Sequence, residues 1–189
     1  MSAVTPCFTP GTLIATDRGW RPVERLRRGN RIVTRDNGLK RIAWAGRRDL
    51  TYEDLTEVPG LTPIMVRKGA LGEGNPSRDM LVSPDHRFLT CDPKGEEVLV
   101  PARLLTHRRG VSKVPVLGVS YLHVLLSAHE VILANGAWTE SFHPEDVTMR
   151  GLAHRTRDEI LSLFPEIETL GAAQRFPAAR RVQQSRFEQ

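Results

Sequence analysis

Two side chains capable of nucleophilic and acid–base chemistry stand far apart in this sequence, Cys7 near its start and His86 near its middle. Cys7 is followed by a Pro-Gly turn signal and a short apolar run, and a cysteine thiolate is a strong nucleophile. His86 closes the motif Ser83-x-x-His86, in which a hydroxyl can orient the imidazole while the other ring nitrogen faces a reacting group. A Cys and a His distant in sequence can meet in the fold, so these residues predict a Cys–His site. The alternative for Cys7 is a buried, unreactive thiol that acts as a small hydrophobe.

The cysteines and several of the histidines are also candidate ligands for a metal ion. Two cysteines do not make a disulfide framework, and we expect Cys7 and Cys91 to be free thiols. The spacings of the candidate ligands fit no C-x-x-C or H-x-x-x-H pattern. We therefore predict neither a metal site nor a cofactor. The ligands considered were Cys7, Cys91, His86, His123 and His143.

The composition indicates one ordinary globular domain with an appendage. The chain has 189 residues, of which 40% are hydrophobic and 26% charged. No apolar run approaches the roughly 20 residues that span a bilayer. The first six residues contain neither a basic region nor an apolar core of a signal peptide. We expect a soluble protein without a membrane partner, cytoplasmic by default, with signal-independent export left open.

The net charge of +5 raises the question of a nucleic-acid partner. Much of the excess lies near the end of the chain, in Arg175, Arg180, Arg181 and Arg186. Aromatic residues are only 6%, fewer than a stacking surface for single strands requires. We predict no nucleic-acid partner. A basic nucleic-acid-binding protein is kept as a third hypothesis, which a steep salt dependence of binding would support.

Short apolar runs separated by turn signals predict an all-β domain between Cys7 and Ser141. The strongest hairpin signals are Asp36-Asn37-Gly38 and Asn135-Gly136, because Asn and Gly tolerate positive φ. Residues 49–61 are polar and predict a surface loop, and residues 23–26 and 101–105 predict short helical turns. Predicted strands cover residues 13–15, 31–35, 40–46, 63–67, 79–82, 87–90, 97–100, 114–126, 130–134 and 137–141.

The pattern changes after the last predicted strand. Residues 156–164 predict an amphipathic helix with Thr156 as its N-cap, and Pro165 ends it or breaks it. Residues 171–189 are rich in Ala, Arg and Gln and predict a mobile tail. The organisation expected is a leader over residues 1–6, a domain over 7–150, and a helical, then flexible, basic tail over 151–189.

Four stretches agree in order and spacing with the blocks of a known family. They resemble the Hint fold of inteins and Hedgehog autoprocessing domains, and look closest to bacterial Hint-domain proteins outside the splicing inteins. The resemblance covers Cys7 to about Ser141 and implies an all-β Hint (Hedgehog/intein) fold. The four stretches are Cys7-Phe8-Thr9-Pro10-Gly11-Thr12-Leu13-Ile14, residues 23–32, Val82-Ser83-Pro84-Asp85-His86-Arg87-Phe88, and Tyr121 followed by residues 129–136.

The resemblance implies self-cleavage before Cys7. Cys7 would attack the carbonyl of Pro6 in an N-to-S acyl shift, so the substrate is the chain's own upstream segment. His86 would protonate the leaving amine, Ser83 would orient the ring, and backbone N–H groups would hold the oxyanion. His129 falls where the family has a histidine that assists Asn cyclisation.

Splicing is not expected from this sequence. Inteins end in an Asn that cyclises, and at the corresponding position this sequence has Thr139-Glu140-Ser141. No Asn is therefore available to cyclise. A structural role is therefore favoured for His129. Pro6 restricts the backbone ahead of Cys7, and we expect it to make the acyl shift slow.

A second hypothesis is an inactive Hint-fold module that binds a partner. Self-processing predicts a Cys7 with a lowered pKa, close to His86 and to the Pro6 carbonyl. The binding module predicts a buried, unreactive Cys7 and an exposed apolar patch elsewhere.

Overall fold

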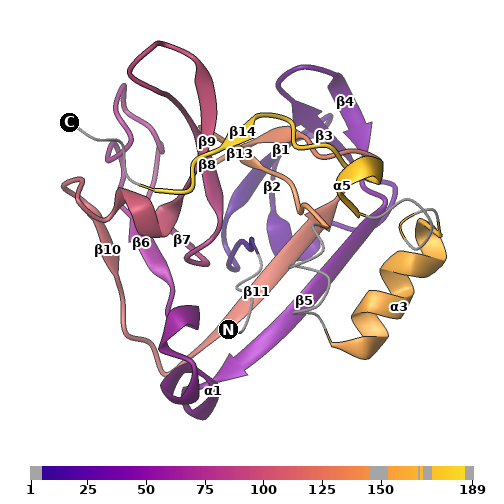
Figure 1. The fold of residues 1–189 in the computed structure, drawn as a ribbon, viewed down its shortest axis with the longest axis horizontal. Helices are drawn as coiled ribbons and strands as arrows, with labels where there is room; N and C mark the ends of the chain where they lie inside the picture. Colours follow the sequence, from indigo (N-terminus) through magenta and orange to yellow (C-terminus); the bar gives the residue numbers. More distant parts are fainter. Residues whose placement is uncertain (1–5, 145–152, 166, 168–171, 186–189) are drawn as a thin grey trace.

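Short β-strands dominate the computed structural model, which describes residues 6–144, 153–165, 167 and 172–185 (Figure 1). The largest sheet has nine strands among these residues, in the order β14-β9-β8-β13-β12-β1-β3-β4, with β2 paired to β1. A three-stranded sheet has the order β10-β6-β7, and β5 pairs with β11 as a separate ribbon. The prediction of an all-β domain is confirmed.

The first hairpins form where the turn residues predict them. Gly38 takes φ of 64°, and the Thr34 hydroxyl donates to its carbonyl oxygen over 2.7 Å. The strand that returns from this turn is shorter than expected, because β4 ends before the buried Ile42 and a new strand begins at Trp44. The elements are β1 (Leu13–Thr16), β2 (Gly19–Pro22), η1 (Val23–Arg25), β3 (Arg31–Thr34) and β4 (Gly38–Arg41).

The predicted surface loop over residues 49–61 is wrong. The strand β5 (Trp44–Thr51) runs into it, and α1 (Tyr52–Glu57) and η2 (Pro59–Leu61) follow. Thr51 caps α1 in a capping box with Asp54, so local polar residues start the helix. Buried Leu50, Leu55 and Leu61 pack together with Tyr121, and this sparse apolar set holds a segment that is polar on average.

The long strand β11 (Gly118–Leu125) pairs antiparallel with all of β5, and the two form the diagonal ribbon that runs through the centre of Figure 1 toward α1. Leu125 lies opposite Trp44 and Gly118 opposite Thr51. The middle of the chain supplies shorter elements, at or near the places predicted. They are β6 (Ile64–Val66), β7 (Met80–Val82), β8 (Arg87–Cys91), β9 (Glu97–Pro101), η3 (Ala102–Leu105) and β10 (Val111–Lys113).

The last predicted hairpin is also confirmed. Strands β12 (Val131–Ala134) and β13 (Ala137–Glu140) pair through Asn135 and Gly136, whose φ angles are 47° and 80°. Both residues sit in the left-handed region that the tight turn requires. The Asn135 side chain also accepts a hydrogen bond from the backbone N–H of Leu13 over 2.9 Å, which ties the turn to β1.

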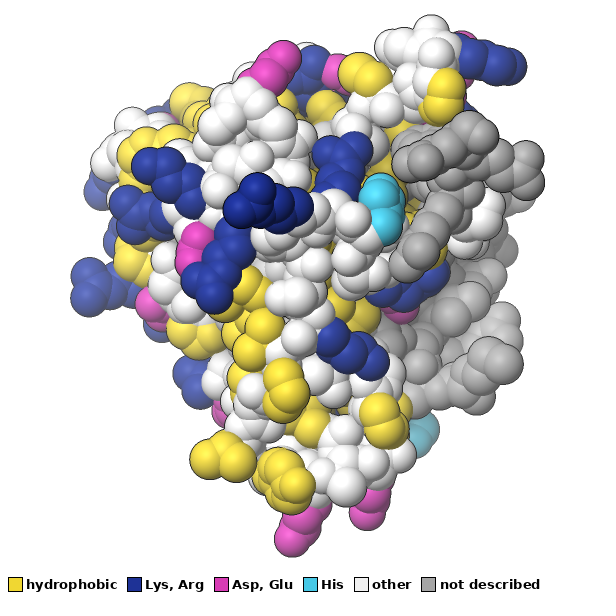
Figure 2. All heavy atoms as spheres, turned by 90° about the vertical axis from the view of Figure 1, so that its left-hand side faces the viewer, with side chains coloured by type: hydrophobic (Ala, Val, Ile, Leu, Met, Phe, Trp, Pro, Cys, Tyr) yellow, Lys and Arg dark blue, Asp and Glu magenta, His cyan; other side chains and the backbone are white. Residues whose placement is uncertain are grey.

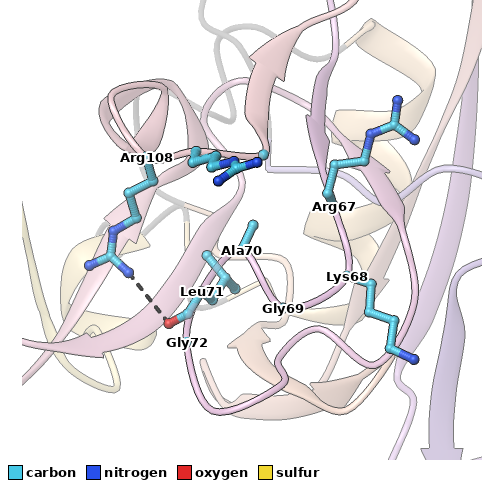
Figure 3. Close-up of a pocket in the computed structure, with 9 residues that line it drawn as sticks. Arg67, Lys68, Gly69, Ala70, Leu71, Gly72 and Arg108 are labelled. Carbon is cyan, nitrogen blue, oxygen red and sulfur yellow. Dashed lines mark hydrogen bonds between the residues drawn. The ribbon is translucent and has the colours of Figure 1, made fainter.

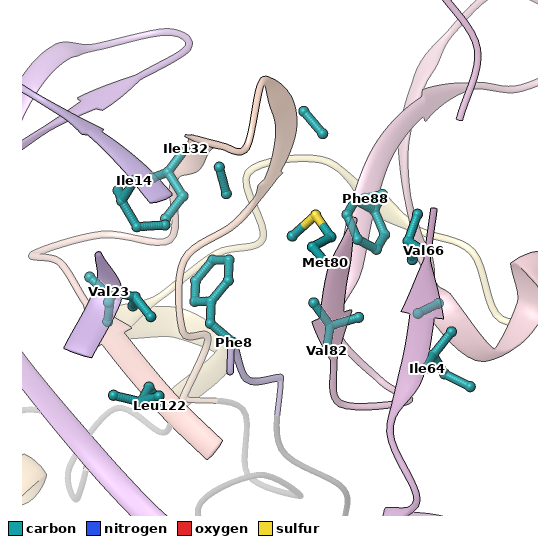
Figure 4. Packing of buried hydrophobic residues seen from close by; sticks show 14 of the residues in the cluster. Phe8, Ile14, Val23, Ile64, Val66, Met80, Val82, Phe88, Leu122 and Ile132 are labelled. Carbon is teal, nitrogen blue, oxygen red and sulfur yellow. The ribbon is translucent and has the colours of Figure 1, made fainter. Parts of the chain in front are cut away.

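The main core gathers around Phe8, whose side chain is 2% exposed. Figure 4 shows the Phe8 ring between side chains of β1 and β12 on one side and side chains of β7 and β8 on the other. This position buries the residue next to Cys7 among strands from the whole length of the domain. The neighbours labelled there include Ile14, Val23, Met80, Val82, Phe88, Leu122 and Ile132.

The C-terminal segment differs from the mobile tail expected over residues 171–189. A helix, α3 (His154–Leu163), forms where one is predicted, and α5 (Ala172–Arg175) and β14 (Arg181–Val182) follow within the expected tail, where β14 pairs in parallel with β9. Phe176 is fully buried in a second apolar cluster with Trp44 and Ile160. The average composition of the segment did not predict this contact, because only one aromatic ring and a few paired arginines hold the segment in place.

Thr156 is not the N-cap, because α3 begins at His154 after Ala153, whose side chain makes no capping bond. Residues 1–5, which make up most of the expected leader, and the expected boundary near residue 150 lie outside the described residues. In the described part of the chain, no helix is long and apolar enough to cross a membrane.

Candidate functional site

Cys7 is placed by the residue after it. Phe8 exchanges two backbone hydrogen bonds of 2.9 Å with Leu122 and also forms an antiparallel bridge with Val82. In antiparallel pairing, the residue that precedes Phe8 lies opposite the residue that follows each of its two partners. Cys7 therefore lies between Ser83 and His123.

On one side, Ser83 holds the peptide group of Cys7. The N–H of Cys7 donates to the Ser83 hydroxyl oxygen over 2.8 Å, and the N–H of Ser83 donates to the Cys7 carbonyl over 3.1 Å. The carbonyl of Ser83 then accepts from the N–H of His86 over 3.1 Å. Ser83 thus binds the nitrogen of the Pro6–Cys7 peptide bond, which corrects the expectation that its hydroxyl orients the His86 ring.

On the other side, His123 contacts the thiol. Its Nδ1 and Nε2 atoms lie 3.5 and 3.7 Å from Cys7 Sγ, and the side chain is buried. The ring also shares a hydrogen bond with the backbone of Pro6. In the sequence, His123 is only a candidate metal ligand, and this contact is not predicted. The signal available was a histidine within the long apolar run of β11, a place where a polar ring requires a partner.

The His86 ring is oriented by Thr139. The Thr139 hydroxyl donates its single proton to the carbonyl of Arg87 over 2.7 Å, so its oxygen must accept from His86 Nε2. The neutral ring therefore carries its proton on Nε2. Its Nδ1 is a bare lone pair with no hydrogen-bond partner among the described residues. The ring packs edge-on against Phe8, with centroids 4.4 Å apart.

Burial controls the protonation of the site. Removal from water raises the pKa of the Cys7 thiol well above its usual value, only partly offset by a hydrogen bond with Ser83 and by the charge of Arg48. Burial also lowers the pKa of His86 to about 3 and that of His123 to about 4. The resting site is thus a neutral thiol beside neutral imidazoles. Self-processing predicts a lowered pKa for Cys7, whereas burial raises it.

His129 lies in a neighbouring cluster and both of its ring nitrogens are engaged. Its Nδ1 accepts from the N–H of Ala179 over 3.1 Å, and its Nε2 lies 3.3 Å from a carboxylate oxygen of Glu140. The ring stacks on His143 with centroids 4.1 Å apart, and His143 Nε2 bonds the carbonyl of Phe176 over 2.6 Å. These contacts join the domain to its C-terminal segment.

Neither cysteine is in a disulfide: Cys7 is buried and Cys91 is exposed. Within the described residues, no group of three or more His, Cys, Asp or Glu side chains is arranged to hold a metal ion. The residues around Cys7 instead form a set suited to nucleophilic acyl chemistry.

A basic pocket of about 870 Å³ lies away from Cys7, between the loops that follow β6 and precede β10 (Figure 3). It is lined by Arg67, Lys68, Arg108 and Arg109, around a floor that includes Leu71. Arg67 is paired with Asp79, and Arg108 donates to the Leu71 carbonyl. Figure 2 shows several Lys and Arg side chains on the side of the molecule that lies at the left of Figure 1.

Comparison with known proteins places this geometry in a family. The sequence profile of the Hint domain matches residues 6–146. Among curated proteins, no sequence matches the chain significantly. Among solved structures, the bacterial intein-like domain from Clostridium thermocellum is 10% identical, with a TM-score of 0.46 over 72% of this chain and 98% of that one.

Two inteins are similar to the same extent. The MchDnaB-1 intein is 11% identical, with a TM-score of 0.45 over 71% of this chain and 98% of its own. The gp41-1 intein is 9% identical, with a TM-score of 0.44 over 71% and 97%. The sequence profile spans most of the chain, including Cys7, the Ser83-x-x-His86 motif and His123. On that evidence the chain belongs to the Hint domain family.

Proposed function

We propose that this domain cleaves its own chain before Cys7 by an N-to-S acyl shift, without splicing. The observation that carries the proposal is that both Cys7 atoms that change bonds are held. Its nitrogen is bound by the Ser83 hydroxyl at 2.8 Å, and its Sγ lies 3.5 Å from a ring nitrogen of His123. A positioned nucleophile beside a proton acceptor is the arrangement that acyl transfer requires.

The proposed step conserves atoms and protons. Cys7 Sγ forms a bond to the carbonyl carbon of Pro6 and gives up its proton. The tetrahedral intermediate then breaks the bond from that carbon to the Cys7 nitrogen, which takes one proton and leaves as an amine. A thioester joins Pro6 to Cys7. Water or an added thiol then attacks this thioester and releases the upstream segment.

His86 remains the candidate that delivers a proton to the departing nitrogen. Its ring is neutral at rest with Nδ1 bare, so it acts as a carrier of the proton that the thiol releases. Thr139 keeps Nε2 occupied and so directs the exchange to Nδ1. Ser83 aligns the nitrogen that must be protonated.

The same arrangement disfavours a second cleavage downstream. Thr139 and Glu140 lie in β13 and are fully buried, with Thr139 bonded to His86 and Glu140 bonded to Arg87. Neither side chain can cyclise as Asn does. His129, engaged by Ala179, serves in this proposal as a structural contact.

Intact mass spectrometry of the full chain, with a well-folded protein fused ahead of Ser2, tests the proposal. Incubation with dithiothreitol or hydroxylamine should release the upstream protein with cleavage before Cys7. Cys7→Ala should abolish release, and His86→Ala should slow it by roughly 10²–10⁴-fold. Cys91→Ala, which changes the exposed cysteine, should leave the rate unchanged.

Pro6→Gly should accelerate cleavage, because it removes the restricted proline ahead of Cys7. A Pro6→Gly fusion that stays intact for days in hydroxylamine would overturn the proposal. Cleavage that persists in Cys7→Ala would overturn it as well.

A second function, an inactive Hint-fold module that binds a partner, is favoured by one observation. Cys7 is only 2% exposed and burial raises its pKa, as expected for an unreactive thiol. Of the exposed large hydrophobic residues, Tyr52 and Leu117 lie at the same end of the β5–β11 ribbon, because Thr51 and Gly118 next to them are paired, whereas Trp20 and Leu39 lie in β2 and β4. The basic pocket is the surface that such a module would offer.

A further inference from the structure

We propose that His123 is a catalytic residue for the acyl shift, acting on the Cys7 thiol with one ring nitrogen and on the Pro6 carbonyl oxygen with the other. This inference rests on the proposed self-cleavage and assigns it a residue that the motif does not contain. His123 lies outside Ser83-x-x-His86 and reaches Cys7 from the opposite strand, β11.

Strand pairing fixes the position of His123 against Cys7. Phe8 and Leu122 are joined by two backbone hydrogen bonds, so the pairing that fixes Phe8 in the core also sets His123 against Cys7. The ring is held by aromatic neighbours: it stacks near Trp44 with centroids 6.0 Å apart and meets Phe142 edge-on at 5.1 Å. A ring locked in this way loses little freedom when the reaction begins.

The His123 ring also contacts the backbone of Pro6. Proline has no backbone N–H, so a hydrogen bond between its backbone and His123 must run from a ring N–H to the Pro6 carbonyl oxygen. That oxygen is the atom that becomes negative when Cys7 attacks. A donor already aimed at it stabilises the oxyanion as it forms.

Only a neutral imidazole can both accept the thiol proton and donate to the Pro6 carbonyl oxygen, since it has one donor and one acceptor nitrogen. Burial keeps the ring neutral, with its pKa lowered to about 4 in spite of the Pro6 contact. Nδ1 is nearer to Sγ, at 3.5 Å, so we assign the lone pair to Nδ1 and the proton to Nε2.

The Cys7 thiol proton passes to His123 Nδ1 while the sulfur electron pair forms the bond to the Pro6 carbon. His123, now an imidazolium, donates from Nε2 to the oxyanion. The proton continues through Nδ1 of His86 to the Cys7 nitrogen as the C–N bond breaks, and both rings return to their neutral state.

The first test is the fusion assay on the full chain. His123→Gln keeps a side-chain donor but has no ring base, and it should slow cleavage by roughly 10²–10⁴-fold. The matched control is His107→Gln, the same substitution at an exposed histidine, which should cleave at the wild-type rate. Wild-type cleavage with an equal rate in folded His123→Gln would overturn the assignment while leaving the proposed function intact.

The second test does not depend on cleavage, and its main measurement uses the wild-type chain. Nitrogen-15 chemical shifts of the wild-type histidines at pH 7 should give His123 an unprotonated Nδ1 and a protonated Nε2. Cys7→Ala should shift the Nδ1 signal, because the thiol is its neighbour. A doubly protonated ring, or a proton on Nδ1, would refute the role of His123 even if the chain never cleaves.

Discussion

The Cys7 region and the His129 region are both buried and rich in histidine, yet their ring nitrogens meet different groups. Around Cys7, His123 contacts the thiol and the Pro6 backbone, and His86 keeps a bare Nδ1. Around His129, the backbone of the C-terminal segment occupies the rings, through Ala179 and Phe176. Burial is therefore common to both regions, and the group that each ring nitrogen contacts is what separates them.

Acidification is expected to have the largest effect, and it acts on the Cys7 region. Because folding lowers the pKa of His86 from 6.5 to about 3 and that of His123 to about 4, the unfolded chain binds more protons below pH 6.5. This contribution to stability is complete above pH 6.5 and is lost as the pH falls toward 3.

The free energy of unfolding in urea should therefore drop by several kcal/mol between pH 7 and pH 4. His123→Gln, which removes one of the two groups, should show a shallower fall. A stability that stays flat over this interval would mean that the two rings are not held neutral by the fold.

Glu140→Ala should produce the largest loss among substitutions, and it acts on the His129 region. Glu140 is fully buried and accepts from Arg87 at its backbone N–H over 2.9 Å and its Nη1 over 3.1 Å. Removing the carboxylate takes the Glu140 ion pair away from a nearly buried guanidinium, so the free energy of unfolding in urea should fall by about 3–5 kcal/mol. Glu140→Gln keeps an acceptor and should lose less. Full stability with abolished cleavage would instead make this region part of the chemistry.

Thr139→Val should have an intermediate effect, because it removes the group that connects the two regions. His86 Nε2 loses its acceptor and the Arg87 carbonyl loses its donor, at a cost of about 1–3 kcal/mol in the free energy of unfolding. The fusion should also cleave more slowly, since the His86 ring is no longer fixed in one tautomer. Thr139→Ser keeps the hydroxyl and should restore both properties, and its failure to do so would assign the effect to packing.

Arg180→Ala should have the smallest effect. Arg180 pairs with Asp36 over 2.7 Å and with Glu97 over 2.8 Å, and its side chain is partly exposed. Such pairs contribute about 0–1 kcal/mol and are screened by salt. Hydrogen exchange of the β14 amides should rise slightly at low salt and match the wild type at high salt. A complete release of β14 would mean that this pair, and not Phe176, anchors the segment.

Much of the fold was predictable because its signals are local. Asn37-Gly38 and Asn135-Gly136 predict tight turns, and both hairpins form there. The segment over residues 49–61 was not predictable as structured, because its order depends on Leu50, Leu55 and Leu61 meeting Tyr121 from a distant strand. The prediction of a mobile C-terminal tail was wrong for the same reason, since Phe176 is stabilised by partners elsewhere in the chain.

The sequence by itself determined the candidate nucleophile, the Ser83-x-x-His86 turn and the family, because these are properties of residue types and their spacing. The tertiary structure decided which side chains touch Cys7. Phe8 pairs with Val82 and with Leu122, and these two pairings put Ser83 on the peptide nitrogen and His123 on the sulfur. It also decided the protonation states, because loss of water around a thiol or an imidazole is a property of the packed core and of no local motif.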